Sequence, residues 1–121
     1  MDIESIRNYC LSLPLTSEDT AFGEDYLLFR VYGKIFACYG FNLEDYFVAK
    51  CDPDYALDLR DRHDEITPAW HWNKRYWNQI SLHGNLSDDT IISLIRHSYS
   101  EVVKKLPKRI KSDCPEICDI Q

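Results

Sequence analysis

Residues 70–78 combine the side chains that most often contact ligands and nucleic acids. The segment is Trp70-His71-Trp72-Asn73-Lys74-Arg75-Tyr76-Trp77-Asn78, and it contains all three tryptophans of the chain. Aromatic rings can stack on nucleobases or carry a cation on their faces, and lysine and arginine neutralise phosphate. Tryptophan is also a large packing residue. The segment therefore has two interpretations, a binding surface or a part of the core, and the sequence leaves both open.

A second group of bases follows the last long apolar stretch. Five bases fall within eight residues with no acid among them: Lys104, Lys105, Lys108, Arg109 and Lys111. The first two can complement the C-terminal end of a helix, and the others can simply keep the end of the chain solvated. The functional alternative is a positive patch that attracts phosphate groups.

The net charge of the chain, −6 over 121 residues, argues against a protein that coats nucleic acid by bulk attraction. The charge is unevenly distributed. Residues 1–65 carry 14 acids and 6 bases, for a net charge of −8, whereas residues 66–111 carry 3 acids and 8 bases, for a net charge of +5. The last ten residues carry 3 acids and no base. Any contact with DNA would use the basic region 66–111, and we expect it to be weak and dependent on salt.

The sequence contains no motif that is typical of catalysis. Four scattered glycines leave no phosphate-binding loop and no dinucleotide fingerprint. Asp61, His63 and Asp64 could be drawn as metal ligands, but such a run is more typical of a solvated helix end. His71 has no serine or cysteine nucleophile beside it in sequence. We therefore expect a protein that is not an enzyme and that carries no metal and no cofactor.

The cysteines indicate a reducing compartment. There are five of them, an odd number: Cys10, Cys38, Cys51, Cys114 and Cys118. The N-terminus is acidic and does not resemble an export signal, and no apolar run approaches the roughly 20 residues that span a bilayer. The spacing of Cys114 and Cys118, without a second ligand pair, is not that of a zinc site. We expect free thiols, a cytoplasmic protein and no membrane partner.

Helices are predicted where capping residues precede apolar residues at helical spacing. Asp2 begins a helix that Pro14 ends, and Asp52-Pro53 begins a second helix that ends near His63. Ser87 begins the longest helix, which carries a wide apolar stripe and is closed by Pro107.

Strands are predicted at residues 27–32, 34–39, 46–51 and 76–83 from their alternating patterns and the turns between them. Residues 16–25 are expected to be a polar connection, and the segment from Ile66 to be extended. Short links favour antiparallel pairing. The sequence thus predicts one α+β domain over residues 1–111, an antiparallel sheet of four or more strands with three helices packed on it, followed by a flexible tail, residues 112–121.

Residues 71–78 resemble the His-x-Asn-Lys-Arg-x-Trp-Asn signature of the MmcQ/YjbR family of small bacterial proteins. Further landmarks occur in the family's order over residues 1–110: Leu11-Ser12-Leu13-Pro14, Phe22-Gly23-Glu24-Asp25, Lys50-Cys51-Asp52-Pro53, His97-Ser98-Tyr99 and Lys105-Leu106-Pro107-Lys108. The chain departs from the usual pattern in having Ala69-Trp70 before His71 and Trp72 after it, which predicts a bulkier and more apolar surface.

The resemblance implies an α+β fold of double-wing type, a label of DNA binding and no established catalytic activity. The leading hypothesis is therefore a non-catalytic DNA-binding protein that contacts phosphates through Lys74, Arg75 and the bases of residues 104–111. The alternative is a domain that binds a small molecule or a protein in a cleft around residues 70–77. The residues that would line this cleft are Trp70, His71, Trp72 and Trp77, and Asn73 is a further candidate for contact with nucleic acid or a ligand.

Overall fold

The computed structural model describes residues 1–41 and 45–120. Its centre is one antiparallel sheet with the strand order β1-β2-β3-β4-β6-β5. The strands are β1 Thr16–Asp19, β2 Tyr26–Val31, β3 Lys34–Gly40, β4 Tyr46–Lys50, β5 Ile66–Pro68 and β6 Trp77–Ser81. The helices are α1 Ile3–Ser12, α2 Pro53–Arg62, α3 Asp88–Val103 and α4 Lys108–Asp113, followed by the 3₁₀ helix η1 Pro115–Asp119. The predicted α+β class is confirmed.

The three predicted helices begin where their capping residues lie. The carboxylates of Asp2 and Asp52 and the hydroxyl of Ser87 each accept a hydrogen bond from a backbone N–H three residues further on. Pro53 occupies the first turn of α2, where its missing N–H costs nothing. The caps thus define the starts of α1, α2 and α3.

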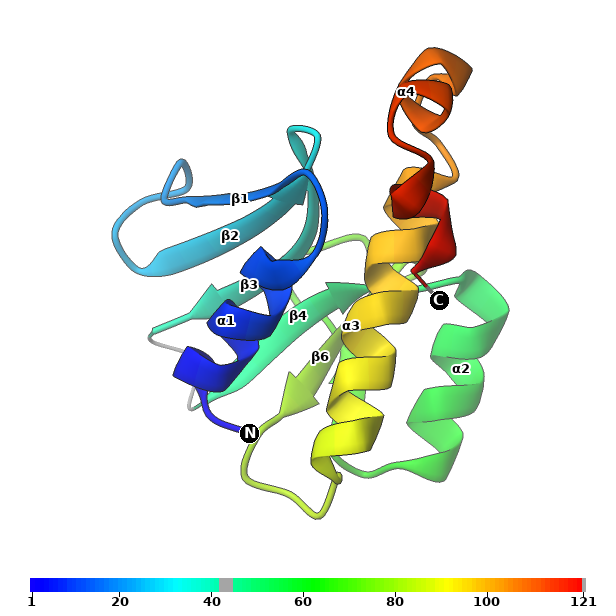
Figure 1. Cartoon of the computed structure of the whole chain (residues 1–121). Coiled ribbons are helices and arrows are strands. Elements are labelled where there is room, and N and C mark those ends of the chain that lie inside the picture. The colour runs from blue at the N-terminus through cyan, green and yellow to red at the C-terminus, as the bar shows by residue number, and fades with distance from the viewer. Residues whose placement is uncertain (42–44, 121) are drawn as a thin grey trace.

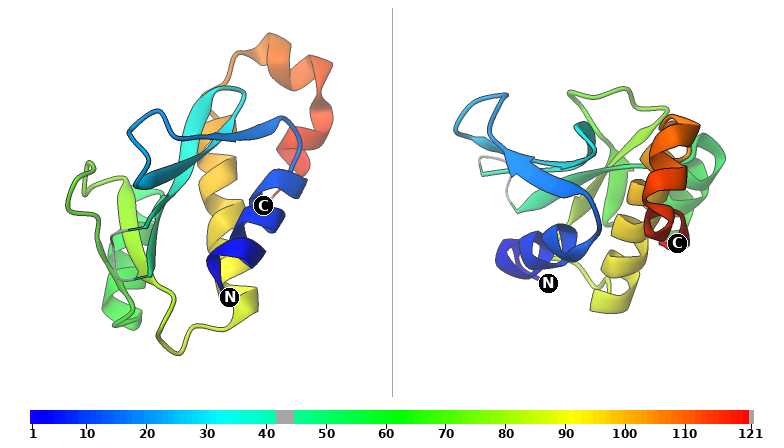
Figure 2. Two further views of the ribbon diagram at one scale, coloured as in Figure 1. Left: turned by 90° about the vertical axis from the view of Figure 1, so that its left-hand side faces the viewer. Right: turned by 45° about the horizontal axis from the view of Figure 1, so that its top comes forward.

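The two faces of the sheet differ in what covers them. Helices α1 and α3 cross the face toward the viewer in Figure 1, and the left view of Figure 2 shows both of them on one side of the sheet. The main core lies there and includes fully buried Ile6, Phe47, Ile95 and Tyr99. The opposite face carries a separate, smaller apolar cluster built on Leu28, Cys38, Val48 and Ala69. We call this second surface the open face.

Strand β1 falls where the sequence predicted a polar connection, so that prediction was wrong for residues 16–19. Thr-Ser-Glu-Asp has no alternation of apolar and polar residues. The strand is held at the edge of the sheet by pairing with β2 and by two ion pairs, Arg7 with Glu18 and Arg30 with Asp19. Such ion pairs depend on the fold and leave no local hydrophobic pattern.

The C-terminal region also differs from its prediction. Helix α3 ends at Val103, and Pro107 caps a short further helix, α4, rather than closing a longer one. Residues 112–120 then return along α3, as Figure 1 shows, and Ile117 is fully buried in the main core. The segment expected to be a flexible tail therefore packs against the domain through an isolated apolar residue, which has no periodic pattern to reveal it.

Ile95 tests the placement of α3. The substitution Ile95→Asp puts a carboxylate into the main core without a partner, and we expect the domain to unfold or nearly so. The control is Ser93→Asp on the exposed side of the same helix, which should change the free energy of unfolding by no more than about 0.5 kcal/mol. Circular dichroism during thermal unfolding measures both. A melting temperature of Ile95→Asp within a few degrees of wild type would contradict this architecture.

Candidate functional site

The signature segment, residues 69–78, lies in the structure as a compact loop that leads into β6. The backbone N–H of Trp72 donates to the carbonyl of Ala69, and that of Tyr76 donates to the carbonyl of Asn73. The side-chain oxygen of Asn73 accepts from the backbone N–H of Arg75 at 3.1 Å. Asn73 is therefore a turn-forming residue.

Arg60 of α2 fixes the signature segment to the rest of the fold. Its Nε donates to the side-chain oxygen of Asn78 at 2.7 Å, and one terminal nitrogen donates to the carbonyls of Lys74 and Trp77. Asn78 is only 2% exposed, and among the described residues its Nδ2 has no hydrogen-bond partner. The planar guanidinium can reach several acceptors at once, which a lysine could not do. Sequence reasoning missed Arg60, because an arginine on the polar side of a helix carries no distinguishing pattern.

The three tryptophans have two different environments. Trp72 and Trp77 lie with ring centroids 4.5 Å apart and pack on the apolar cluster of the open face. Trp70 is 72% exposed. Trp72 and Trp77 therefore serve packing, whereas the ring of Trp70 is accessible to solvent.

Beside Trp72 the open face is hollowed by a pocket of about 350 Å³, which we call the aromatic hollow. Its lining residues are Phe22, Tyr26, Cys38, Val48, His71, Trp72, Asn73 and Gln79. The ring of Phe22 reaches across from the loop before β2 to within 5.9 Å of the Trp72 ring, centroid to centroid. Among the residues that the structure describes, no lysine, arginine or carboxylate lines the hollow. Phe22 and Tyr26 were not predicted as site residues, although Phe22 begins one of the family landmarks.

Four cations in or beside the signature segment lie over aromatic rings. Lys74 Nζ is 4.9 Å from the centroid of the Trp70 ring, and Lys50 Nζ is 5.7 Å from that of Trp77. The guanidinium carbon of Arg75 and the Nζ of Lys105 each lie 5.6 Å from the Tyr76 ring centroid. We call these residues the signature cations: Lys50, Lys74, Arg75 and Lys105. The turn after α3 thus brings Lys105 to the segment, while Lys50 was not predicted as a site residue.

The rest of the predicted basic cluster is directed elsewhere. Lys104 Nζ pairs with the Glu101 carboxylate at 2.5 Å, and Lys111 Nζ donates to the backbone carbonyl of Lys104 at 2.9 Å. Lys108 and Arg109 are exposed on α4. Five bases that are adjacent in sequence therefore do not form one surface, because the chain turns between α3 and α4.

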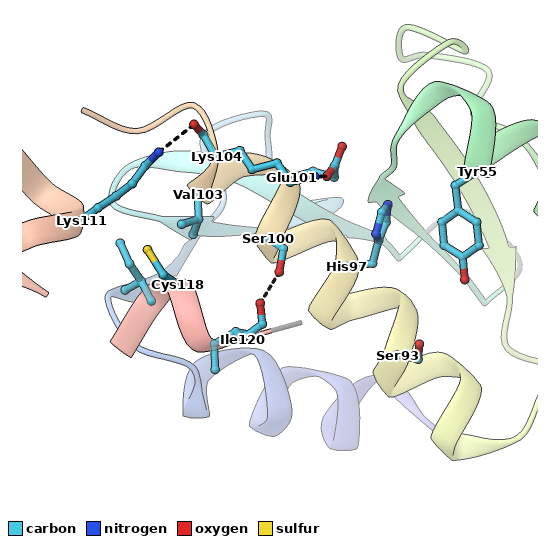
Figure 3. A pocket seen from close by; sticks show the side chains of 11 residues that line it. Tyr55, Ser93, His97, Ser100, Glu101, Val103, Lys104, Lys111, Cys118 and Ile120 are labelled. Atoms are coloured by element: carbon cyan, nitrogen blue, oxygen red, sulfur yellow. Dashed lines mark hydrogen bonds and ion pairs between the residues drawn. The ribbon is translucent and has the colours of Figure 1, made fainter. Parts of the chain in front are cut away.

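A second pocket, of about 510 Å³, lies between α2, α3 and the returning C-terminal segment (Figure 3). Several of its polar groups are already engaged with one another. Ser100 donates to the carbonyl of Ile120, and Glu101 and Lys111 both contact Lys104. These bonds hold the C-terminal segment in place, so we assign this pocket a structural role.

His97, on the wall of that second pocket, is a satisfied histidine of the fold. Its Nε2 accepts the backbone N–H of Asp52 at 3.1 Å. Burial lowers the pKa of His97, with smaller and partly opposing effects from Glu101, Lys104 and Asp52. The neutral ring is favoured at neutral pH and serves as an acceptor.

The five cysteines are free thiols, as predicted. Burial raises the pKa of Cys10, Cys38 and Cys51 to about 12, so their thiolates are scarce at neutral pH. A hydrogen bond from Cys114 to the Glu116 carboxylate raises the pKa of the Cys114 thiol to about 11. Over residues 1–41 and 45–120 no three histidine, cysteine or acidic residues are grouped as metal ligands, and no helix has the length and apolar character to cross a membrane.

Comparison with known proteins identifies the family of this chain. A sequence model of the YjbR family matches residues 11–101. The chain belongs to the YjbR family. The matched span includes Arg60 and the whole signature segment, whereas Lys105 lies beyond it.

Individual relatives agree with this assignment. The protein YjbR of Escherichia coli K12 is 37% identical over 59 residues, which are 49% of this chain and 50% of that protein, so the chain spans half the length of that relative. YbdF of Escherichia coli O157:H7 is 29% identical over 107 residues, 88% of each chain.

Two crystal structures share the fold. One is protein DR2400 of Deinococcus radiodurans, a DUF419 domain, with a TM-score of 0.84 and 26% identity over 93% of this chain and 86% of that one. The other is a Pseudomonas syringae protein with a TM-score of 0.69 and 27% identity over 81% of this chain and 96% of that one.

Arg60→Met tests how the signature segment of this YjbR-family protein is held. The change keeps the apolar stem but removes the donors to Asn78, Lys74 and Trp77. We expect the free energy of unfolding to fall by about 1.5–3 kcal/mol, together with altered fluorescence of Trp72 and Trp77. The matched control is Arg62→Met, which removes a charge that pairs with Asp58 at the surface of the same helix and should cost no more than about 1 kcal/mol. Equal effects of the two substitutions would contradict the assigned role of Arg60.

The thiols provide a further test. A titration under denaturing, non-reducing conditions should count five thiols, and in the native protein exposed Cys118 should react before Cys10, Cys38 and Cys51 because only accessible thiolates attack the reagent. Peptide mapping after brief alkylation identifies the site. A count of three or one would indicate disulfides and refute the prediction.

Proposed function

We propose that this YjbR-family protein is a non-catalytic DNA-binding protein that contacts phosphates through the signature cations. One observation carries the proposal. Within residues 1–41 and 45–120, none of the four signature cations forms an ion pair with a carboxylate, whereas Arg7, Arg30, Arg62 and Lys104 all do. The signature cations thus keep their charge available for a partner.

The aromatic rings under these cations favour the same function. A cation on a ring face gains about 0.5–1 kcal/mol at an exposed site, which limits its motion without neutralising its charge. The N–H donors that point away from the ring stay free for phosphate oxygens. The exposed ring of Trp70 adds a surface on which an unpaired base can stack.

The charge of the whole chain limits this binding. A protein of net charge −6 is repelled by duplex DNA at long range, so only the local positive face can dock. Phosphate contacts position a protein but carry no direct sequence information. We therefore propose binding that is weak, steeply dependent on salt and largely insensitive to sequence.

Titration of a mixed-sequence duplex at about 50 mM salt tests the proposal. For Lys74→Ala and Lys105→Ala we expect weaker binding, and a slope of log affinity against log salt that is flatter by about 0.9 for each phosphate that the variant no longer neutralises. Lys104→Ala is the matched control, since it removes the same charge one residue from Lys105 at a side chain that pairs with Glu101. It should leave the slope unchanged.

Three outcomes would refute DNA binding through this face: no binding at tens of micromolar protein, an affinity that salt does not alter, or an equal effect of Lys104→Ala and Lys105→Ala.

The second candidate function, which these outcomes would favour, is the binding of a small uncharged molecule in the aromatic hollow. The lining supports it, because aromatic and apolar side chains surround a few polar groups there. A ligand in the hollow would quench the fluorescence of Trp72, and Trp72→Phe would abolish that signal.

A further inference from the structure

A third pocket, of about 400 Å³, lies where the turn after α3 meets the ends of β3 and β4. We call it the lysine pocket. Its lining residues are Lys34, Ile35, Lys50, Val102, Lys105, Leu106 and Pro107. The lysines come from three different elements, the first residue of β3, the last residue of β4 and the turn after α3.

The charges of the lysine pocket are not balanced within the protein. No acidic side chain lines it, and among the described residues neither Lys34, Lys50 nor Lys105 has an ion-pair partner. Lys50 is only partly exposed. Burial first, and then the charge of Lys105, lower the pKa of Lys50; Glu101 opposes this shift but already pairs with Lys104. A partly desolvated cation beside like charge is costly, and a bound anion would relieve that cost.

The apolar walls of the lysine pocket indicate what kind of group an anion bound there would carry. Val102 and Leu106 are 4% and 6% exposed, and with Ile35 and Pro107 they form the apolar part of the lining. A phosphodiester of a DNA backbone has no apolar body to cover such walls. A small molecule with an anionic head and an aliphatic body complements both the charge and the walls.

We propose that the lysine pocket binds a small amphiphilic anion, with its carboxylate or similar head between Lys34, Lys50 and Lys105 and its aliphatic body against Val102 and Leu106. The proposed ligand differs from DNA, although the lysine pocket shares Lys50 and Lys105 with the proposed DNA-binding surface. Lys34 and the apolar walls take no part in the DNA proposal.

Octanoate is the probe, and its neutral analogue octanamide is the chemical control. We expect octanoate to shift the backbone amide signals of Lys34, Lys50, Lys105 and Leu106 in an NMR titration, and octanamide to bind at least about tenfold more weakly. Lys50→Met keeps the length and apolar character of the side chain but removes its charge, and should weaken octanoate binding about tenfold or more. Lys104→Met is the matched control and should leave octanoate affinity unchanged.

Thermal unfolding gives a second measurement. Without ligand, Lys50→Met should melt a few degrees higher than wild type, because the substitution removes a partly buried charge next to Lys105. At the same concentration, octanoate should then raise the melting temperature of wild type more than that of Lys50→Met.

The proposal is overturned if octanoate shows no binding at about 10 mM, if octanamide binds as well, or if Lys50→Met binds octanoate as wild type does. Octanoate shifts confined to the aromatic hollow would also overturn it. The failure of DNA binding is distinguishable, because it appears in the duplex titration of Lys74→Ala, a residue outside the lysine pocket.

Discussion

The guanidinium group of Arg60 connects α2 to the loop that covers the open face. Its hydrogen bonds to Asn78 and to the carbonyls of Lys74 and Trp77 fix the start of β6 and the turn before it. With this turn in place, Trp72 and Trp77 close the smaller apolar cluster, and Lys74 and Arg75 are directed to solvent. The wall of the aromatic hollow and two of the signature cations, Lys74 and Arg75, depend on this interaction, so a helix outside the loop helps to determine the surface on which binding is proposed.

The two faces of the sheet differ in how they are covered. One face is buried under α1 and α3 in the main core, where a change of volume or charge is costly. The other is covered by a loop that packs on the smaller cluster. Two adjacent residues at the end of α3 also differ in their contacts. Lys104 pairs with Glu101, whereas Lys105 lies over the ring of Tyr76. Substitutions on the open face can therefore alter the exposed surface without altering the main core.

Structural features that are set by neighbouring residues in the sequence were predictable, and features that depend on contacts between distant residues were not. Asp2, Asp52 and Ser87 marked the helix starts because a cap acts on the next few residues. Residues 71–78 were recognised as a candidate site from their types and their family resemblance. Arg60 was missed because its acceptors lie 14 to 18 residues away. Strand β1 and buried Ile117 were missed for the same reason, since ion pairs and tertiary packing create them. The bases of residues 104–111 look continuous in sequence, but Lys104 pairs with Glu101 and Lys111 bonds the Lys104 carbonyl, whereas Lys105 lies over the Tyr76 ring.

The two edges of the sheet also bear on how copies of this protein behave in concentrated solution. At one edge β1 has four residues, and the charged side chains of Glu18 and Asp19 are engaged with Arg7 and Arg30. At the other edge β5 has three residues and ends in Pro68, which has no N–H to donate. Short edge strands that carry charge or proline are poor templates for a further strand. Both ends of the sheet therefore disfavour edge-to-edge aggregation, and the protein can keep an accessible hollow on one face of its sheet without inviting fibrous self-association.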